Sequence, residues 1–265
     1  MLPRMPPAAP STRAPALAEV LVALEQAYGK PAPPRLTDPF DLILLENASY
    51  LVDDERRVAV FDALSARIGT TPEAILTAKP GVLAAAIEGG GMRPPMRAEK
   101  LREAAELAHD MDLDRLRAAM RESPEQARKQ IKKFPGMGEP GADKLLLFYR
   151  CAPSLAPDSN VLRVLVRLGF VHEESSYDKT YRAAKQAVAP ELPEGYDAII
   201  TARELLRRHG QTVCMRTAPA CGACPLAKRC VFFAASGGII RTSPAASPDG
   251  PISPGGCAPR RARPP

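Results

Sequence analysis

The 265-residue sequence has no run of about 18 or more apolar residues, the length that a membrane-spanning helix needs. The first sixteen residues contain Arg4 and Arg13 but no uninterrupted apolar stretch, so a secretory signal is not expected and a short organellar presequence is the alternative. The alternating pattern of strands is almost absent, and no segment recurs at the period of a solenoid protein. These absences favour a helical protein without a membrane span.

The composition is that of a folded globular protein, with 45% hydrophobic and 25% charged residues. The formal net charge is +6, and the segment 237–265 contributes +3 of it, since four arginines there face one aspartate. The rest of the chain is therefore only mildly basic, which is a weak indication of a polyanionic partner.

Prolines mark both ends of the chain. Five of the first fifteen residues are proline, and a Pro/Ser/Gly-rich stretch follows Ala235, so we expect disorder over 1–15 and 237–265. Between these ends the apolar residues recur at helical spacing, and Gly and Pro separate the segments. The fold class predicted is all-α, with about ten helices.

Several helix ends have clear local signals. A helix over 16–28 ends at Gly29, and the pairs Asp38-Pro39 and Thr71-Pro72 each place a capping residue before a proline in the first turn. Further helices are predicted over 97–109, 123–133, 160–168 and 196–209.

Four of the six cysteines lie within seventeen residues, with the spacing C-x6-C-x2-C-x5-C: Cys214, Cys221, Cys224 and Cys230. Without a secretion signal, such a group indicates a metal site before a disulfide framework. Four thiolates suit tetrahedral zinc or the four irons of a cubane cluster, and one compact loop with a single C-x2-C pair favours the cluster over zinc. Cys151 and Cys257 stand alone and are interpreted as a small buried hydrophobe and a tail residue.

A glycine-rich turn, Phe134-Pro135-Gly136-Met137-Gly138, precedes a helical segment. Backbone N–H groups at the start of a helix lie at the positive end of its dipole and suit a phosphate, although such a turn is more often a plain helix–helix connection. Lys132 and Lys133 lie just before it. Twenty residues after Gly138, Asp158 precedes an apolar helical run and is expected to be its N-cap, a role compatible with facing a ligand.

Together these motifs resemble the helix-hairpin-helix DNA glycosylases of the endonuclease III and adenine-mismatch glycosylase group, from about residue 38 to residue 232. The turn is similar to the family's L-P-G-V-G, and 158–165 is similar to the D-G-N-V-x-R-V-L of the adenine-mismatch branch. His209-Gly210 leads into the cysteine loop as in the family, and the loop has the family's spacing, including Cys221-Gly222-x-Cys224-Pro225. The resemblance favours a 4Fe–4S cluster over zinc.

The resemblance implies two helical domains: a cluster-bearing domain of 16–37 plus 153–236, and a helical barrel of 38–152 with its hairpin at 134–142. It implies double-stranded DNA with a damaged or mismatched base in the cleft between them, the base being flipped out because its glycosidic bond is unreachable inside a stacked duplex. The cluster's implied role is structural and DNA-positioning. We expect a monomer in the bacterial cytoplasm, associated with the nucleoid.

Two carboxylates are the implied catalytic residues. Asp158 matches the family's aspartate, which stabilises the oxocarbenium character that develops on the sugar. Glu46 is similar in position to the catalytic glutamate of the adenine-mismatch branch; in an otherwise apolar helix its pKa is expected to be raised, so that it can donate a proton, with a helix-surface glutamate as the alternative.

Position 140 departs from the family. Bifunctional members have there the lysine that forms a Schiff base with the sugar, and Pro140 has no amine. We therefore expect a monofunctional glycosylase. Lys144, one helical turn later, is the residue for a lyase alternative, although a DNA-phosphate contact or a surface position is favoured for it. A catalytically inactive DNA-binding protein is the other alternative.

Tyr50 and Leu51 stand where relatives have glutamines that enter the space left by the flipped base, and Met92 is a candidate wedge from the opposite side. The residues expected to contact DNA are Gly136, Met137, Gly138, Lys133, Lys144, Met92, Tyr50 and Leu51. Uracil or thymine in mismatches, oxidised pyrimidines and alkylated purines are all open as substrates. Adenine opposite oxidised guanine is disfavoured, because that branch usually has a further C-terminal domain.

Overall fold

The computed structural model describes residues 14–236. The disorder expected at the two ends of the chain falls almost wholly outside these residues, as does the interpretation of Cys257.

The described residues form thirteen α-helices and no strand, which confirms the predicted all-α class. The helices are α1 (Leu17–Tyr28), α2 (Pro39–Ala48), α3 (Asp54–Arg67), α4 (Pro72–Thr77), α5 (Pro80–Ala86), α6 (Pro94–Met111), α7 (Leu113–Glu122), α8 (Pro124–Ile131), α9 (Glu139–Phe148), α10 (Ser159–Leu168), α11 (Tyr177–Val188), α12 (Tyr196–Thr212) and α13 (Val231–Ala235). Short 3₁₀ turns occupy Glu88–Gly90, Ala189–Glu191, Cys221–Ala223 and Ala227–Arg229.

The predicted helix starts have the capping contacts that their sequences indicate. The Asp38 carboxylate accepts the N–H of Phe40 at 2.9 Å at the start of α2, and the Thr71 hydroxyl accepts the N–H of Ala74 at 3.2 Å at the start of α4. Helix α1 ends at Gly29, whose φ of +72° lies in the left-handed region that glycine adopts readily. Helix α6 begins three residues before its predicted start, and α8 ends two residues before its predicted end.

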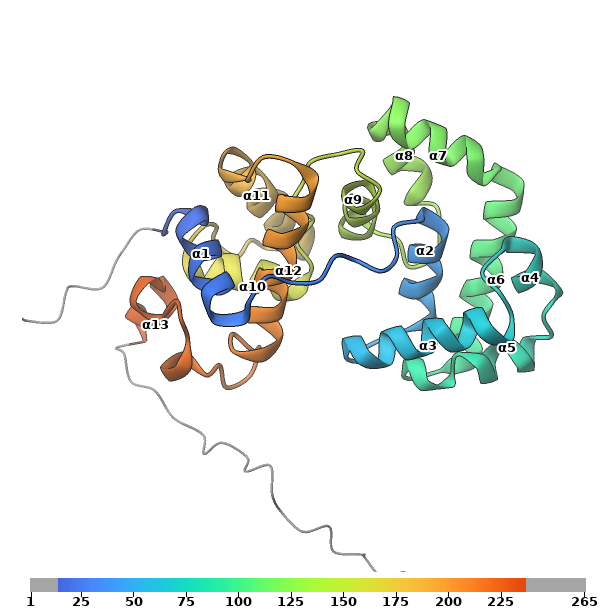
Figure 1. Cartoon of the computed structure of the whole chain (residues 1–265), viewed down its shortest axis with the longest axis horizontal. Coiled ribbons are helices and arrows are strands. Elements are labelled where there is room, and N and C mark those ends of the chain that lie inside the picture. Colours follow the sequence, from blue (N-terminus) through green and yellow to red (C-terminus); the bar gives the residue numbers. More distant parts are fainter. Residues whose placement is uncertain (1–13, 237–265) are drawn as a thin grey trace, which may run out of the picture.

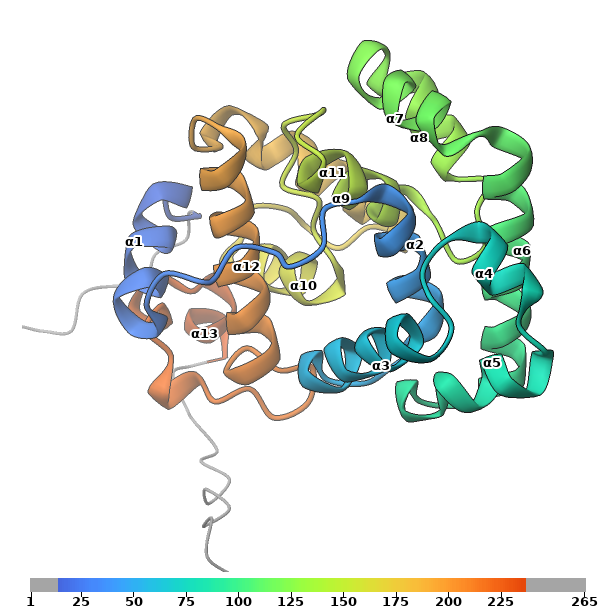
Figure 2. The same ribbon diagram turned by 45° about the vertical axis from the view of Figure 1, so that its right-hand side comes forward.

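The buried apolar residues form two clusters. One is built mainly from α2 to α9, and the other from α1, α10, α11 and α12 with Leu226 of the cysteine loop. Figures 1 and 2 show α1, α10, α12 and α13 on one side of the molecule, α2 to α8 on the other, and α9 between them. Helix α12 contributes to both clusters, with Ile199 and Ile200 in the first and Leu205 and Leu206 in the second. The division into domains of 16–37 plus 153–236 and 38–152 stays a prediction, which the two clusters support.

Among residues 14–236, every helix is too short or too polar to cross a lipid bilayer.

Candidate active site and metal centre

Asp158 is the N-cap of α10, as its sequence context indicates. Its Oδ1 accepts the backbone N–H groups of Asn160 at 2.8 Å and Val161 at 3.0 Å, so the carboxylate is fixed at the positive end of the helix. Its Oδ2 accepts Nε of Arg207 at 2.9 Å and lies 3.6 Å from Nη2 of Arg203.

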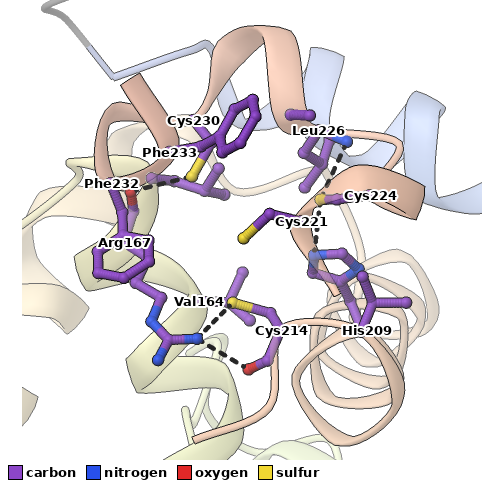
Figure 3. A pocket seen from close by; sticks show the side chains of 13 residues that line it. Val164, Arg167, His209, Cys214, Cys221, Cys224, Leu226, Cys230, Phe232 and Phe233 are labelled. Carbon is purple, nitrogen blue, oxygen red and sulfur yellow. Dashed lines mark hydrogen bonds between the residues drawn. The ribbon is translucent and has the colours of Figure 1, made fainter. Parts of the chain in front are cut away.

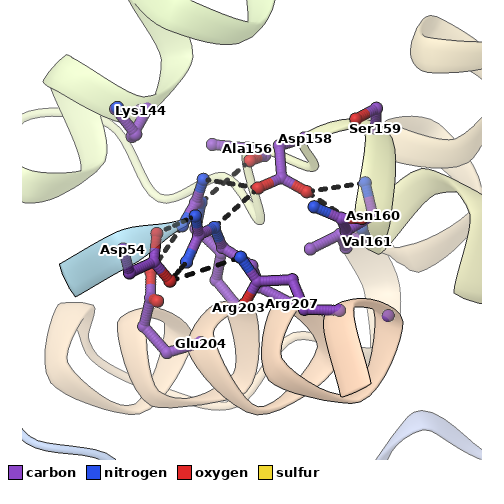
Figure 4. A network of polar contacts seen from close by, with 12 residues as sticks. Asp54, Lys144, Ala156, Asp158, Ser159, Asn160, Val161, Arg203, Glu204 and Arg207 are labelled. Carbon is purple, nitrogen blue, oxygen red and sulfur yellow. Dashed lines mark hydrogen bonds and ion pairs between the residues drawn. The ribbon is translucent and has the colours of Figure 1, made fainter. Parts of the chain in front are cut away.

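The two arginines come from one face of α12 and point toward Asp158 (Figure 4). Burial alone would raise the pKa of the Asp158 carboxyl group, but the charges of Arg203 and Arg207 and the two N–H donors outweigh burial and hold that pKa below its ordinary value. Arg207 also makes a bidentate contact with Asp54 at the start of α3, with Nη2 at 2.5 Å from Oδ1. Asp158 is therefore an ionised carboxylate in a network that joins α3, α10 and α12.

Glu46 lies in α2 and pairs with two cations: Arg57 Nη2 at 2.7 Å and Nζ of Lys144. Burial alone would raise its pKa, but Lys144 and Arg57 outweigh burial and bring the pKa down to about 2. The expectation of a raised pKa was wrong, because the apolar neighbours within α2 say nothing about cations from α3 and α9. Glu46 is ionised here and has no proton to donate; it is neither a free acid nor a solvated surface glutamate.

Lys144 occupies the other half of this ion pair. Burial lowers the pKa of its ammonium group, and the attraction of Glu46 offsets only part of that effect. Its side chain is 13% exposed. The interpretation of Lys144 as a helix-surface residue was therefore wrong.

A cleft of about 600 Å³ brings the partners of the two carboxylates together. Lys144, Arg57, Arg203, Arg207 and Asp54 line it. Its apolar lining consists of Leu36, Leu42, Leu45, Val58, Phe61 and Phe148, with further lining from the segment between α1 and α2. Arg203 interacts electrostatically with both carboxylates, because its charge lowers the pKa of Glu46 and that of Asp158. The cleft is thus lined by Lys144 and by the arginines that pair with Glu46 and Asp158, while the two carboxylates lie behind these cations.

The hairpin lies between α8 and α9. Gly136 has a φ of +73°, and a Cβ there would lie 2.9 Å from Oδ1 of Asn47, whose Nδ2 donates to the Pro135 carbonyl at 2.9 Å. Gly136 and Gly138 are exposed, and neither of their N–H groups has an acceptor among residues 14–236. Asn47 of α2 therefore anchors the hairpin, and the N–H groups of the exposed Gly136 and Gly138 are left without acceptors in the described part of the chain.

The remaining hairpin residues divide into two groups. Lys133 is exposed, as a DNA contact requires, and Pro140 lies in the first turn of α9. Met137 is only 5% exposed and its N–H donates to the Phe134 carbonyl at 3.1 Å. The prediction that Met137 contacts DNA was therefore wrong for its side chain and its N–H, because the side chain packs in the core beneath the hairpin.

Tyr50, Leu51 and Met92 are exposed apolar residues on adjacent segments. Tyr50 forms an isolated backbone bridge with Gly91, next to Met92. These three residues thus lie on neighbouring segments, as expected of residues that contact one site on DNA.

The four clustered cysteines line one pocket between α10, α12 and α13, and Figure 3 shows their sulfur atoms turned toward a common space. Apolar side chains surround the sulfurs, among them Val164, Leu226 and Phe233. None of the four is in a disulfide. Among residues 14–236, no three His, Cys, Asp or Glu side chains are grouped closely enough to hold a single metal ion.

Hydrogen-bond donors are directed at these sulfurs. Arg167 Nη1 lies 3.3 Å from the Cys214 sulfur, and the Leu226 N–H lies 3.4 Å from the Cys224 sulfur. The buried His209 lies with Nε2 at 3.6 Å from Cys224, and burial lowers its pKa to about 4. Donors such as the Arg167 guanidinium and the Leu226 N–H stabilise thiolate ligands.

Burial disfavours the thiolate form of three of the four cysteines. Burial raises the pKa of Cys224 to about 11 and, with the neighbouring cysteines, raises the pKa of Cys221 and Cys230. Thiolates gathered in this pocket would need a cationic group among them, and four cysteine side chains turned toward one space are the donor set that an iron–sulfur cluster would use. The isolated Cys151 is only half-buried and packs against the first apolar cluster, so its interpretation as a small hydrophobe is confirmed in part.

Several residues of the site were missed by the sequence interpretation: Asn47, Asp54, Arg57, Arg203 and Arg207. One signal was available, because Arg203, Arg207 and Gln211 recur at four-residue spacing and share one face of a helix. Asn47, Asp54 and Arg57 have no such local signal, because their contacts are with residues far away in the sequence or on other helices.

No family model matches the chain. It is 25% identical to Endonuclease III of Sulfolobus acidocaldarius over 196 residues, which cover 73% of this chain and 82% of that protein. It is 26% identical to Endonuclease III of Thermotoga maritima over 197 residues, covering 74% and 84%.

Solved structures share the fold at low sequence identity. A non-covalent Endonuclease III–DNA complex superposes with a TM-score of 0.66 at 18% identity, covering 84% of this chain and 97% of that one. A thermostable thymine-DNA glycosylase superposes with a TM-score of 0.61 at 18% identity, covering 82% and 94%.

Proposed function

We propose that this chain, which is an endonuclease III-like helix-hairpin-helix DNA glycosylase by sequence and fold, excises a damaged or mismatched base from DNA without cleaving the strand. The observation that carries the proposal is the ionised Asp158, fixed at the N-terminus of α10 and paired with Arg203 and Arg207, which line a cleft of about 600 Å³.

Asp158 has the charge that the reaction needs. When the N-glycosidic bond breaks, its electron pair leaves with the base and the sugar gains oxocarbenium character, which a nearby carboxylate stabilises. Water then adds to the sugar carbon and loses a proton, leaving an abasic site. Asp158 is held in place by backbone donors and α12 arginines, so it does not have to reorganise as charge develops.

Glu46 has a different role in this proposal from the proton donor expected of it. As an anion paired with Lys144 and Arg57, it fixes two cations at the wall of the cleft. Protonation of the leaving base is left to water or to a group that approaches with the DNA.

The proposed partner is double-stranded DNA, bound by a monomer. The N–H groups of Gly136 and Gly138 bind a phosphate at the start of α9, with Lys133 adding charge. Tyr50, Leu51 and Met92 enter the base stack, where apolar side chains replace stacking contacts that a flipped base gives up.

Cys214, Cys221, Cys224 and Cys230 would hold the proposed 4Fe–4S cluster. When bound, the cluster supplies a rigid covalent anchor for the loop that links α12 to α13. The chain's own contribution is the pair of donors from Arg167 and the Leu226 N–H toward the sulfurs, with the ring of His209 in contact with the Cys224 sulfur.

A lyase activity at Lys144 is the second candidate. Its buried amine lines the cleft and has a lowered pKa, which favours a nucleophile, whereas its ion pair with Glu46 and the absence of an amine at Pro140 favour a monofunctional enzyme. Borohydride trapping on lesion-bearing DNA separates the two. We expect no covalent adduct; an adduct that Lys144→Ala abolishes and Lys132→Ala keeps would establish the lyase, since Lys132 pairs with Glu139 outside the cleft.

The glycosylase itself is tested by measuring free base released from duplexes carrying uracil or thymine mismatches, oxidised pyrimidines or alkylated purines. We expect at least one duplex to lose its base. Tight binding to such duplexes without release of any base would instead support the inactive DNA-binding alternative.

A further inference from the structure

Arg97 of α6 is a buried guanidinium that contacts only backbone carbonyls. It is 5% exposed, and no carboxylate among residues 14–236 pairs with it. Its Nε donates to Met92 at 3.0 Å, its Nη2 to Gly91 at 2.8 Å, and its Nη1 to Ile87 at 2.9 Å and also to Ala48. Burial lowers the pKa of Arg97. A buried charge without a counter-ion is costly, so the contacts of the guanidinium with these carbonyls have to offset that cost.

Arg97 holds two chain segments against each other: the end of α2 at Ala48 and the loop 87–92. These segments also bond directly, because the Tyr50 N–H donates to the Gly90 carbonyl at 2.7 Å. A Cβ at Gly90 would overlap the Ala48 oxygen and lie 2.5 Å from Arg97 Nη1. A Cβ at Gly91 would overlap the Tyr50 oxygen. The two segments are therefore as close as their backbones allow.

The joined segments present three apolar side chains to solvent. Tyr50 is 56% exposed, Leu51 77% and Met92 63%. Leu51 and Arg93 both have a φ of +55°, a left-handed conformation that costs non-glycine residues energy and persists only where surrounding contacts impose it. Exposed apolar side chains on an imposed backbone resemble a preformed ligand-contacting surface more than two independent loops.

We propose that Arg97 is a positioning residue that joins segments 48–51 and 87–93 into one rigid wedge, so that Tyr50, Leu51 and Met92 enter the duplex together. The proposal rests on the function proposed above, in which these side chains contact DNA. A wedge ordered before binding avoids the entropy cost of ordering two loops on the duplex, which would otherwise weaken binding.

The test uses a duplex with one tetrahydrofuran abasic analogue opposite 2-aminopurine, a probe that needs no knowledge of the natural lesion. Fluorescence anisotropy measures affinity, and 2-aminopurine emission measures unstacking of the base opposite the analogue. Wild type is expected to bind this duplex more tightly than an undamaged one and to raise the emission.

Arg97→Lys is expected to weaken binding by about tenfold, the equivalent of ordering one more residue, and to lose most of the rise in emission. Arg102→Lys is the matched control, because Arg102 lies on the same helix and donates to the Leu76 and Ala78 carbonyls, both at 3.1 Å, away from the wedge. It is expected to keep both properties. Wild-type affinity and emission for Arg97→Lys, or equal losses for Arg102→Lys, would overturn the role of Arg97.

If Arg97→Lys does not fold, as circular dichroism would reveal, the exposed residues decide the question. In a rigid wedge, Leu51→Ala and Met92→Ala each lose most of the emission, and the double variant loses little more. Independent, multiplicative losses would overturn the proposal. A wild type without preference for the tetrahydrofuran duplex would instead refute the proposed function and, with it, the wedge.

Discussion

Replacing Asp158 with asparagine removes one charge and places an amide NH2 group, which only donates, where Oδ2 now accepts from Arg207. The amide oxygen of the new side chain can still accept the N–H groups of Asn160 and Val161, since asparagine and aspartate are equally good N-caps. Arg207 keeps its bidentate contact with Asp54 but loses the acceptor of its Nε–H, so we expect a loss of about 1 to 3 kcal/mol in the free energy of unfolding.

The effect on base release should be far larger. A carboxylate about 4 Å from a developing positive charge, at an effective dielectric constant of about 20, stabilises that charge by about 4 kcal/mol. Losing this stabilisation slows the chemical step by about a thousandfold. Single-turnover base release from a duplex that the wild type processes, with enzyme in excess, measures that step without interference from product release.

Asp38→Asn is the matched control. Asp38 also caps a helix through Oδ1 and pairs with an arginine through Oδ2, with Nη2 of Arg117 at 2.8 Å, but Arg117 does not line the cleft, unlike the arginine partners of Asp158. It should lose similar stability and keep its rate. A rate for Asp158→Asn within tenfold of wild type, or an equal loss in Asp38→Asn, would refute the assignment of Asp158.

Glu46→Gln should make stability depend less on pH in the acid range. In the folded protein the pKa of Glu46 is depressed to about 2, so its ion pair with Lys144 and Arg57 adds up to about 3 kcal/mol to the free energy of unfolding above the unfolded pKa of about 4.5, and this contribution disappears as the pH falls toward 2. An equal fall in the melting temperature of both proteins between pH 5 and 2 would contradict this. Cys221→Ser should reduce the absorbance near about 400 nm expected of a cluster-loaded protein, whereas Cys151→Ser should not, and a colourless wild type with bound zinc would contradict the cluster. Pro140→Lys places an amine in the first turn of α9 and should create an adduct that borohydride traps on lesion-bearing DNA. A variant that still releases the base but forms no adduct would show that position 140 does not face the sugar.

Local signals were sufficient for the parts of the fold that depend on neighbours in the chain. The caps at Asp38 and Thr71 fixed two helix starts, and the cysteine spacing located the pocket of Figure 3. Helices α3 and α7 were missed because they are rich in charge and bury few residues: Val60, Phe61 and Leu64 in α3, and Leu116 and Met120 in α7. Their apolar periodicity is too sparse to separate them from loops.

The charge states of the site depend on residues far apart in the chain. Glu46 is paired with a lysine 98 positions away, and Arg207 reaches Asp54 across 153 positions. Periodicity within α2 therefore predicted the wrong protonation state for Glu46. Asp158 was predicted better because its cap contacts lie within three residues.

The most direct test of the central claim is strand cleavage of the lesion duplexes by the purified wild type, with and without hot alkali. A glycosylase without lyase activity leaves abasic sites, so breaks at the lesion should appear only after alkali. Breaks of equal amount without alkali would contradict the monofunctional assignment. The absence of breaks in every duplex after alkali would contradict base excision itself.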